Sequence, residues 1–153
     1  MTVTSAPLPV PPDPADAPEM AARLRLAVTR LHRTLRRQVA SGLTPSQIST
    51  LAAAERLGTP TLGELAAAEV VQPPSMTRTV ASLESTAMLE RLVDPDDGRV
   101  VRVRVTAEGR RTLQRIRSMR TALLARRLGL LTDEERGRLA EAVPLLERLV
   151  EAP

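Results

Sequence analysis

The chain has 153 residues, 42% of them hydrophobic, which favours one globular domain with its own core. It contains no cysteine, which excludes disulfides and thiol chemistry, and no Phe, Trp or Tyr, which removes the aromatic stacking that usually grips single-stranded nucleic acid. The formal net charge is +4, and a basic chain of this kind is consistent with a polyanionic partner.

The first 18 residues, MTVTSAPLPVPPDPADAP, contain six prolines and no hydrophobic periodicity. Proline lacks an amide donor and disrupts both helix and sheet, so a disordered tail is predicted. This segment also lacks the basic and apolar blocks of a secretory signal. No apolar run in the chain reaches the roughly 18 residues that a membrane span needs. We therefore expect a cytoplasmic protein without a membrane partner.

Residues 19–42 are predicted to form the first helix. Leu24, Val28, Leu31 and Leu35 recur at the spacing of one helical stripe, and Gly42 is typical of a helix end. The stripe is apolar although the segment is rich in arginine. It therefore predicts a surface that packs against another helix.

The segment that follows is divided by strong helix-start signals. Thr44-Pro45-Ser46-Gln47 and Thr61-Leu62-Gly63-Glu64 both have the pattern of a capping box, and Gly58 separates them. The dipeptide Pro73–Pro74 then starts another helix, which is expected to run to about Thr86. The pattern predicts two short helices, a turn and a third helix.

The third of these helices has two different faces. Its apolar positions at helical spacing are predicted to be buried, and they are Met76, Val80, Leu83 and Ala87. The opposite face carries Ser75, Arg78, Ser82 and Ser85. Small hydroxyl side chains around one arginine suit a helix that lies close against a negatively charged partner. The alternative is a weakly charged surface without a partner.

A β-hairpin is predicted after that helix. Asp97–Gly98 is a strong turn signal between strands expected at Leu89–Val93 and Val100–Val105. In the second strand, alternation places Val101, Val103 and Val105 on the body and Arg102 and Arg104 outward. At the tip, Asp97 can orient Arg99 as a cationic probe; an ordinary surface ion pair is the alternative reading.

Two further helices are expected in residues 107–153. Thr106 can cap the first, which carries Leu113, Ile116, Leu123 and Leu124 and ends near Gly129. Thr132–Glu135 forms another capping box for the last helix, where Pro144 is expected to cause a kink or a split. The apolar positions of this helix are Leu139, Val143, Leu146 and Val150.

Residues 43–109 resemble the DNA-binding core of the MarR family of transcriptional regulators. The resemblance is carried by Leu43–Gln47, Leu62–Ala66 and the segments PSMTRTVASLE and ERLVDPDDGRVVRVRVTAEG, the last of which follows the family's wing signature. It implies a mainly α winged helix-turn-helix fold with a two-stranded β-wing. It also implies a homodimer built from helices in 19–42 and 107–153, with 43–106 as the DNA-binding lobe. The apolar stripes on those terminal helices independently favour self-association, because one chain would leave them uncovered.

The same resemblance implies a set of contacts with double-stranded DNA. The helix after Pro73 would enter the major groove and the wing tip the minor groove, as expected for a regulator, most commonly a repressor, on an inverted repeat. The residues implied are Ser75, Thr77, Arg78 and Ser82 on the helix, Arg91 near the phosphate backbone, and Asp97 and Arg99 at the wing tip.

The chain departs from the family pattern at three positions. Ala87 stands where the family usually has glycine, and a positive φ there would cost roughly 1 kcal/mol. Gly98 replaces the usual first arginine of the wing tip, and Pro144 lies within a helix implied in dimerisation.

A small-molecule effector is a further implication, since family members are often released from DNA by one. The polar candidates here are arginine side chains and His32 as a weak ligand candidate. One histidine without cysteine does not favour a zinc site, so no metal or cofactor is expected. An enzyme is not expected either, because no nucleophile motif or phosphate-binding loop is present. The main alternative is a dimeric helical protein-interaction module that has lost DNA binding.

Overall fold

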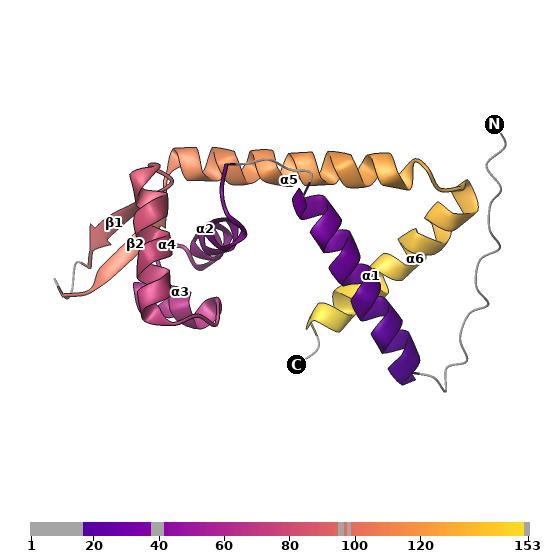
Figure 1. Cartoon of the computed structure of the whole chain (residues 1–153), viewed down its shortest axis with the longest axis horizontal. Helices are drawn as coiled ribbons and strands as arrows, with labels where there is room; N and C mark the ends of the chain where they lie inside the picture. The colour runs from indigo at the N-terminus through magenta and orange to yellow at the C-terminus, as the bar shows by residue number, and fades with distance from the viewer. Residues whose placement is uncertain (1–16, 38–41, 95–96, 98, 152–153) are drawn as a thin grey trace. The chain divides into compact units, whose positions relative to one another are not determined.

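The computed structural model describes residues 17–37, 42–94, 97 and 99–151. In these residues the order of elements is α1, α2, α3, α4, β1, β2, α5 and α6 (Figure 1). The chain forms two compact units, of which the first contains α1 and the second contains all later elements. The predicted N-terminal tail lies outside the described residues, apart from its last two positions, which belong to α1.

Helix α1 (Ala17–Arg37) starts two residues before the predicted helix. Its predicted end at Gly42 follows residues 38–41, which lie outside the described residues, although Gly42 itself has the expected positive φ of 71°. Val28 and Leu31 of the apolar stripe are about half exposed, while Leu24 and Leu35 are partly buried. The stripe therefore exists, but much of it is uncovered.

Helices α2 (Pro45–Leu57) and α3 (Leu62–Ala68) begin with the predicted capping boxes. The Oγ1 atom of Thr44 accepts the amide of Gln47, whose Oε1 atom accepts the amide of Thr44 at 2.7 Å. Thr61 and Glu64 make the same reciprocal pair at the start of α3. Both boxes satisfy amides that have no partner within the helix, which fixes where each helix starts.

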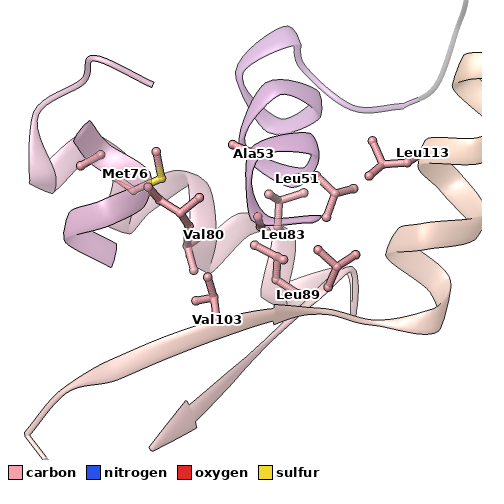
Figure 2. Close-up of a cluster of buried hydrophobic side chains, with 12 residues drawn as sticks. Leu51, Ala53, Met76, Val80, Leu83, Leu89, Val103 and Leu113 are labelled. Carbon is pink, nitrogen blue, oxygen red and sulfur yellow. The ribbon is translucent and has the colours of Figure 1, made fainter. Parts of the chain in front are cut away.

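Helix α4 (Pro73–Ser85) packs on α2 and α3 through a core of aliphatic side chains (Figure 2). Met76, Val80 and Leu83 are buried against Leu51 of α2 and Leu65 of α3, among others. The prediction that Ala87 belongs to this buried face is wrong. The helix ends two residues earlier, Ala87 has a φ of 55°, and its side chain is exposed.

Strands β1 (Leu89–Val93) and β2 (Val101–Val105) form the predicted antiparallel hairpin. Val103 and Val105 join the core and Val101 is partly buried, which confirms the predicted inward face. Arg104 is exposed as predicted, whereas Arg102 is only partly exposed because its guanidinium is bonded to Asp94 and to the loop before α3. Gly98 lies outside the described residues.

Helix α5 (Ala107–Leu128) starts at the predicted Thr106 cap, and its residues Leu113 and Ile116 are buried. Helix α6 (Asp133–Glu151) begins with the predicted Thr132–Glu135 capping box and is not split by Pro144. No described residue of α6 is buried. Its large apolar side chains, including the predicted Leu139, Val143, Leu146 and Val150, are all exposed.

Candidate nucleic-acid interface

The outward face of α4 carries four of the predicted site residues. Ser75, Thr77, Arg78 and Ser82 are all exposed, because Met76, Val80 and Leu83 point into the core from the other side of the helix. Pro73 starts the helix, a position that suits proline because its missing amide would have no partner within the helix. The sequence therefore presents small hydroxyl groups and one guanidinium on a supported helix.

The hydroxyl groups on this face differ in their existing bonds. Thr77 donates to the carbonyl of Pro73 at 3.0 Å, so its oxygen is oriented along the helix. Ser82 accepts a bond of 2.8 Å from Nε2 of Gln47, which joins α4 to the start of α2. The sequence pattern predicted Gln47 as a capping residue only and gave no sign of this second role. Gln47 thus ties the capping box of α2 to the exposed face of α4.

The two arginines on or near this face, Arg78 and Arg91, differ in their ion pairing. Arg78 has no carboxylate within ion-pairing distance in the described part of the chain. Arg91 on β1 is paired with Glu84 of α4, Nε to Oε2, at 2.9 Å, and both side chains are about one-third exposed. The pair connects the wing to α4, and it leaves Arg91 less available to a new anionic partner than Arg78.

At the tip of the wing, Arg99 and Asp97 are both exposed. The Oδ1 atom of Asp97 accepts the main-chain amide of Arg99 at 2.9 Å. The observed contact holds the backbone of Arg99; the sequence predicted that Asp97 orients Arg99 without specifying the atoms. The side chain of Arg99 is presented outward from a braced turn.

At the turn end of the wing strands, the structure contains an interaction that the sequence pattern did not predict. Asp94 is 8% exposed, and its carboxylate is paired with Nε of Arg102. A second nitrogen of Arg102 donates to the carbonyl of Thr59 at 3.2 Å. Thr59 is 43 residues from Arg102 and Asp94 is eight residues from it, and the alternation of β2 predicted only that Arg102 faces outward.

Other kinds of site have less support. His32 is exposed on α1, in the separate first unit. Within residues 17–37, 42–94, 97 and 99–151, no cluster of His, Asp and Glu is arranged to hold a metal ion. No helix in the same ranges is long and apolar enough to cross a membrane. An open hollow of about 520 Å³ lies between α2 and α5 and is lined by Arg56, Glu69 and Arg117, among others.

A helix-turn-helix with an exposed polar face, followed by a β-hairpin with an arginine at its tip, defines a winged helix-turn-helix DNA-binding protein. The MarR family model matches residues 43–101, which span α2 to the start of β2. An HTH-type transcriptional regulator of Mycobacterium bovis is 41% identical over 133 residues, covering 86% of this chain and 93% of that protein. The HTH-type transcriptional repressor MdtR of Bacillus subtilis is 30% identical over 72% of this chain and 70% of its own length. The chain belongs to the MarR family of transcriptional regulators.

Solved structures agree with this assignment. A crystal structure of a Pseudomonas aeruginosa protein described as a transcriptional regulator has a TM-score of 0.80 at 37% identity, covering 93% of this chain and all of that one. A mutant of S. aureus MepR bound to an oligodeoxyribonucleotide has a TM-score of 0.67 at 19% identity, covering 85% of this chain and 97% of that one. At 19% identity, the similarity to MepR shows a shared fold.

Proposed function

We propose that this regulator is a homodimer that binds an inverted repeat in double-stranded DNA and represses transcription. The observation that carries the proposal is the exposed face of α4, where Ser75, Thr77 and Ser82 lie around Arg78, which has no ion-pair partner among the residues that the structure describes. A major groove admits an α-helix, and small side chains allow close approach. Repression is favoured by the relative MdtR, which is itself named a repressor.

Each site residue has a proposed role that follows from its chemistry. Arg78 would donate two hydrogen bonds to the O6 and N7 atoms of guanine in the major groove. Ser75, near the N-terminus of α4, would donate to a phosphate oxygen, where the helix dipole also favours negative charge. Thr77 would do the same after its hydroxyl hydrogen leaves the Pro73 carbonyl. Ser82 would contact DNA through its hydroxyl while it still accepts the hydrogen bond from Gln47.

The wing would act in the neighbouring minor groove. Arg99 would enter that groove, whose negative potential attracts arginine, and Asp97 would hold the turn by its bond to the Arg99 amide. Arg91 would contact phosphate after exchanging its partner Glu84 for the DNA backbone. The MepR complex with an oligodeoxyribonucleotide supports DNA as the ligand of this fold.

Self-association would supply the two-fold symmetry that an inverted repeat requires. The exposed apolar side chains of α1 and α6 support a second copy as their partner. Two such lobes would read half-sites about 34 Å apart, one turn of the double helix. We also propose a small polar effector. The hollow between α2 and α5 is its proposed binding site, and binding there would change the conformation of the DNA-binding lobe.

Selection of bound duplexes from a random pool tests the proposal directly. We expect a palindrome with half-sites one helical turn apart. Replacing Arg78 by Ala should weaken binding by about 1–3 kcal/mol and relax the base preference at one position per half-site. The matched control is Arg126→Ala, which removes the same charge from an exposed position at the far end of α5.

The outcomes separate the candidate functions. If no common sequence is selected, and if Arg78→Ala and Arg126→Ala weaken binding equally, sequence-specific recognition by α4 is ruled out. A dimer that binds no duplex at any salt concentration would instead favour the protein-interaction module.

A further inference from the structure

The ion pair between Asp94 and Arg102, at the turn end of the wing, is built differently from the other ion pairs of the hairpin. Asp94 lies directly after β1, and its side chain is 8% exposed, although a buried carboxylate is costly without a partner. Arg102 of β2 supplies that partner through Nε. By contrast, Arg104 and Glu90 pair across the strands at 2.8 Å with both side chains about half exposed. An exposed pair of that kind contributes little to structure.

Arg102 also fastens the wing to the helix-turn-helix. Its NH1 atom donates to the carbonyl of Thr59 at 3.2 Å, in the loop between α2 and α3. The backbone is joined at the same place, because Arg102 forms a bridge with Thr61 and the Val103 amide donates to the carbonyl of Pro60 at 2.8 Å. Glu64 of α3 lies 4.0 Å from the same NH1 atom. One guanidinium thus links the wing to the loop before α3.

Asp94, which follows β1 at the turn end of the hairpin, carries this connection into the tip of the wing. Its Oδ1 atom accepts the amide of Asp97 at 3.2 Å, and its own amide donates to the carbonyl of Val100 at 3.0 Å. Asp97 in turn accepts the amide of Arg99. Consecutive hydrogen bonds therefore run from Thr59 through Arg102, Asp94 and Asp97 to Arg99.

We propose that Arg102 and Asp94 are positioning residues for DNA binding: their ion pair fixes the wing on the α2–α3 loop and shapes the turn that presents Arg99. This inference rests on the proposed function, since it assigns no DNA contact to either residue and acts through Arg99. A planar guanidinium suits the role because it holds a carboxylate and a carbonyl at once in fixed directions.

The first test compares two arginines of one strand. Arg102→Gln and Arg104→Gln remove the same charge from the same face of β2, two residues apart. Affinity is measured by fluorescence anisotropy with the duplex that the unmodified protein selects. We expect Arg102→Gln to weaken binding about tenfold, the size of one lost specific contact, and Arg104→Gln to weaken it less than about twofold. Equal losses in the two variants would overturn the proposal.

The second test sets positioning against simple electrostatics. Asp94→Asn removes a negative charge from a lobe that binds a polyanion, so charge alone predicts tighter binding. Positioning predicts weaker binding, together with faster hydrogen exchange at the Asp97 and Arg99 amides. Tighter or unchanged binding by Asp94→Asn would contradict the proposal.

The third test asks whether the effect passes through Arg99. In an Arg99→Ala background, Arg102→Gln should cause no further loss, whereas a full additional tenfold loss would show that Arg102 acts independently. If Arg99→Ala alone binds as tightly as the unmodified protein, the role proposed for the wing tip fails instead. The two failures are therefore distinguishable.

Stability is controlled in each variant, because Arg102→Gln leaves the Asp94 carboxylate without this partner. Binding is measured well below the thermal unfolding midpoint of every variant. If the glutamine variant does not fold, Arg102→Lys replaces it, since a single ammonium keeps the charge but not the fork geometry. We then expect an intermediate loss of affinity; full affinity of the lysine variant would overturn the proposal.

Discussion

Ala87 and Val70 hold backbone conformations that their side chains disfavour. Their φ values are 55° and 52°, in the left-handed region, and they lie just beyond the two ends of α4. A non-glycine residue there costs roughly 1–2 kcal/mol, because Cβ crowds the following carbonyl. The turns before and after α4 are therefore both strained. The departure from the family pattern predicts this strain at Ala87 alone, and the positive φ of Ala87 confirms the condition on which the predicted cost depends.

Replacing Ala87 by glycine should raise the free energy of unfolding by roughly 1 kcal/mol, less the extra entropy that glycine adds to the unfolded chain. Urea denaturation measures the change. The control is Ala81→Gly at an exposed position within α4, where the same substitution should lower stability by about 1 kcal/mol. A loss of stability at both positions would show that the left-handed turn carries no strain.

Gly109 is required for a different reason, which is space. A Cβ atom at this position would lie 2.3 Å from the carbonyl oxygen of Met88 and 2.9 Å from a methyl group of Val105. Gly109→Ala should therefore lower the free energy of unfolding by about 1–3 kcal/mol, as overpacking does in a close-packed core. In Gly137→Ala, where the added atom meets nothing within 4 Å in helix α6, stability should rise by up to about 1 kcal/mol. Thermal unfolding of the two variants compares them, and equal shifts would contradict the steric argument.

At the scale of elements, the start of each capped helix could be predicted because a capping box is a local pattern. Thr61 and Glu64 are three residues apart, and no distant contact is needed to form their two bonds. Helix ends were harder, because the apolar period at Ala87 continues past the point where the backbone leaves the helix. The face of Arg102 was harder still, since Thr59, its bonding partner, is 43 residues away.

The capping box of α3 leads to a prediction about how the stability of the protein depends on pH. The pKa of Glu64 is lowered, mainly because its carboxylate accepts the Thr61 amide, with smaller contributions from the Thr61 side chain and Arg102. The pKa of Glu64 is lower in the folded than in the unfolded chain. Ionised Glu64 therefore stabilises the fold at pH values above the ordinary glutamate pKa of about 4.3. That contribution is lost as pH falls through the lowered value.

The unmodified protein should accordingly exceed Glu64→Gln in stability at neutral pH, and the difference should vanish as the solution is acidified through that window. Urea denaturation at a series of pH values measures it. Thr44→Ala is the control, because the box of α2 uses the uncharged Gln47 and its loss of about 1 kcal/mol should not change over the same range. A difference for Glu64→Gln that persists in acid would exclude the ionised carboxylate as its cause.

For the whole molecule, the sequence predicted which residues of α4 face outward but not how they are supported. The helical periodicity of apolar residues places Arg78 and Met76 on different faces of α4, and the candidate site could be predicted from that separation. The bonds of Ser82 to Gln47 and of Asp94 to Arg102 depend on how separate elements meet, and no local pattern carries that information.

The proposed self-association would unite the remaining features, because one lobe could reach only one half-site of the proposed inverted repeat. Leu146 lies within the exposed apolar surface of α6 and is 37% exposed in a single chain. In the proposed dimer this surface is covered, so Leu146→Asp would bury a charge and separate the copies. We expect the unmodified protein to sediment at twice the 16.6 kDa chain mass and the variant at once that mass.

The separated chain should also lose most of its affinity for the selected palindrome while still binding a single half-site weakly. Val93→Asp is the control: Val93 is 71% exposed on the wing, so the same kind of change should leave the native mass unaltered. If Leu146→Asp remains dimeric, α6 is not the contact between copies. If it becomes monomeric and still binds the palindrome at full affinity, the two half-sites are read independently and the two-fold arrangement contributes nothing to recognition.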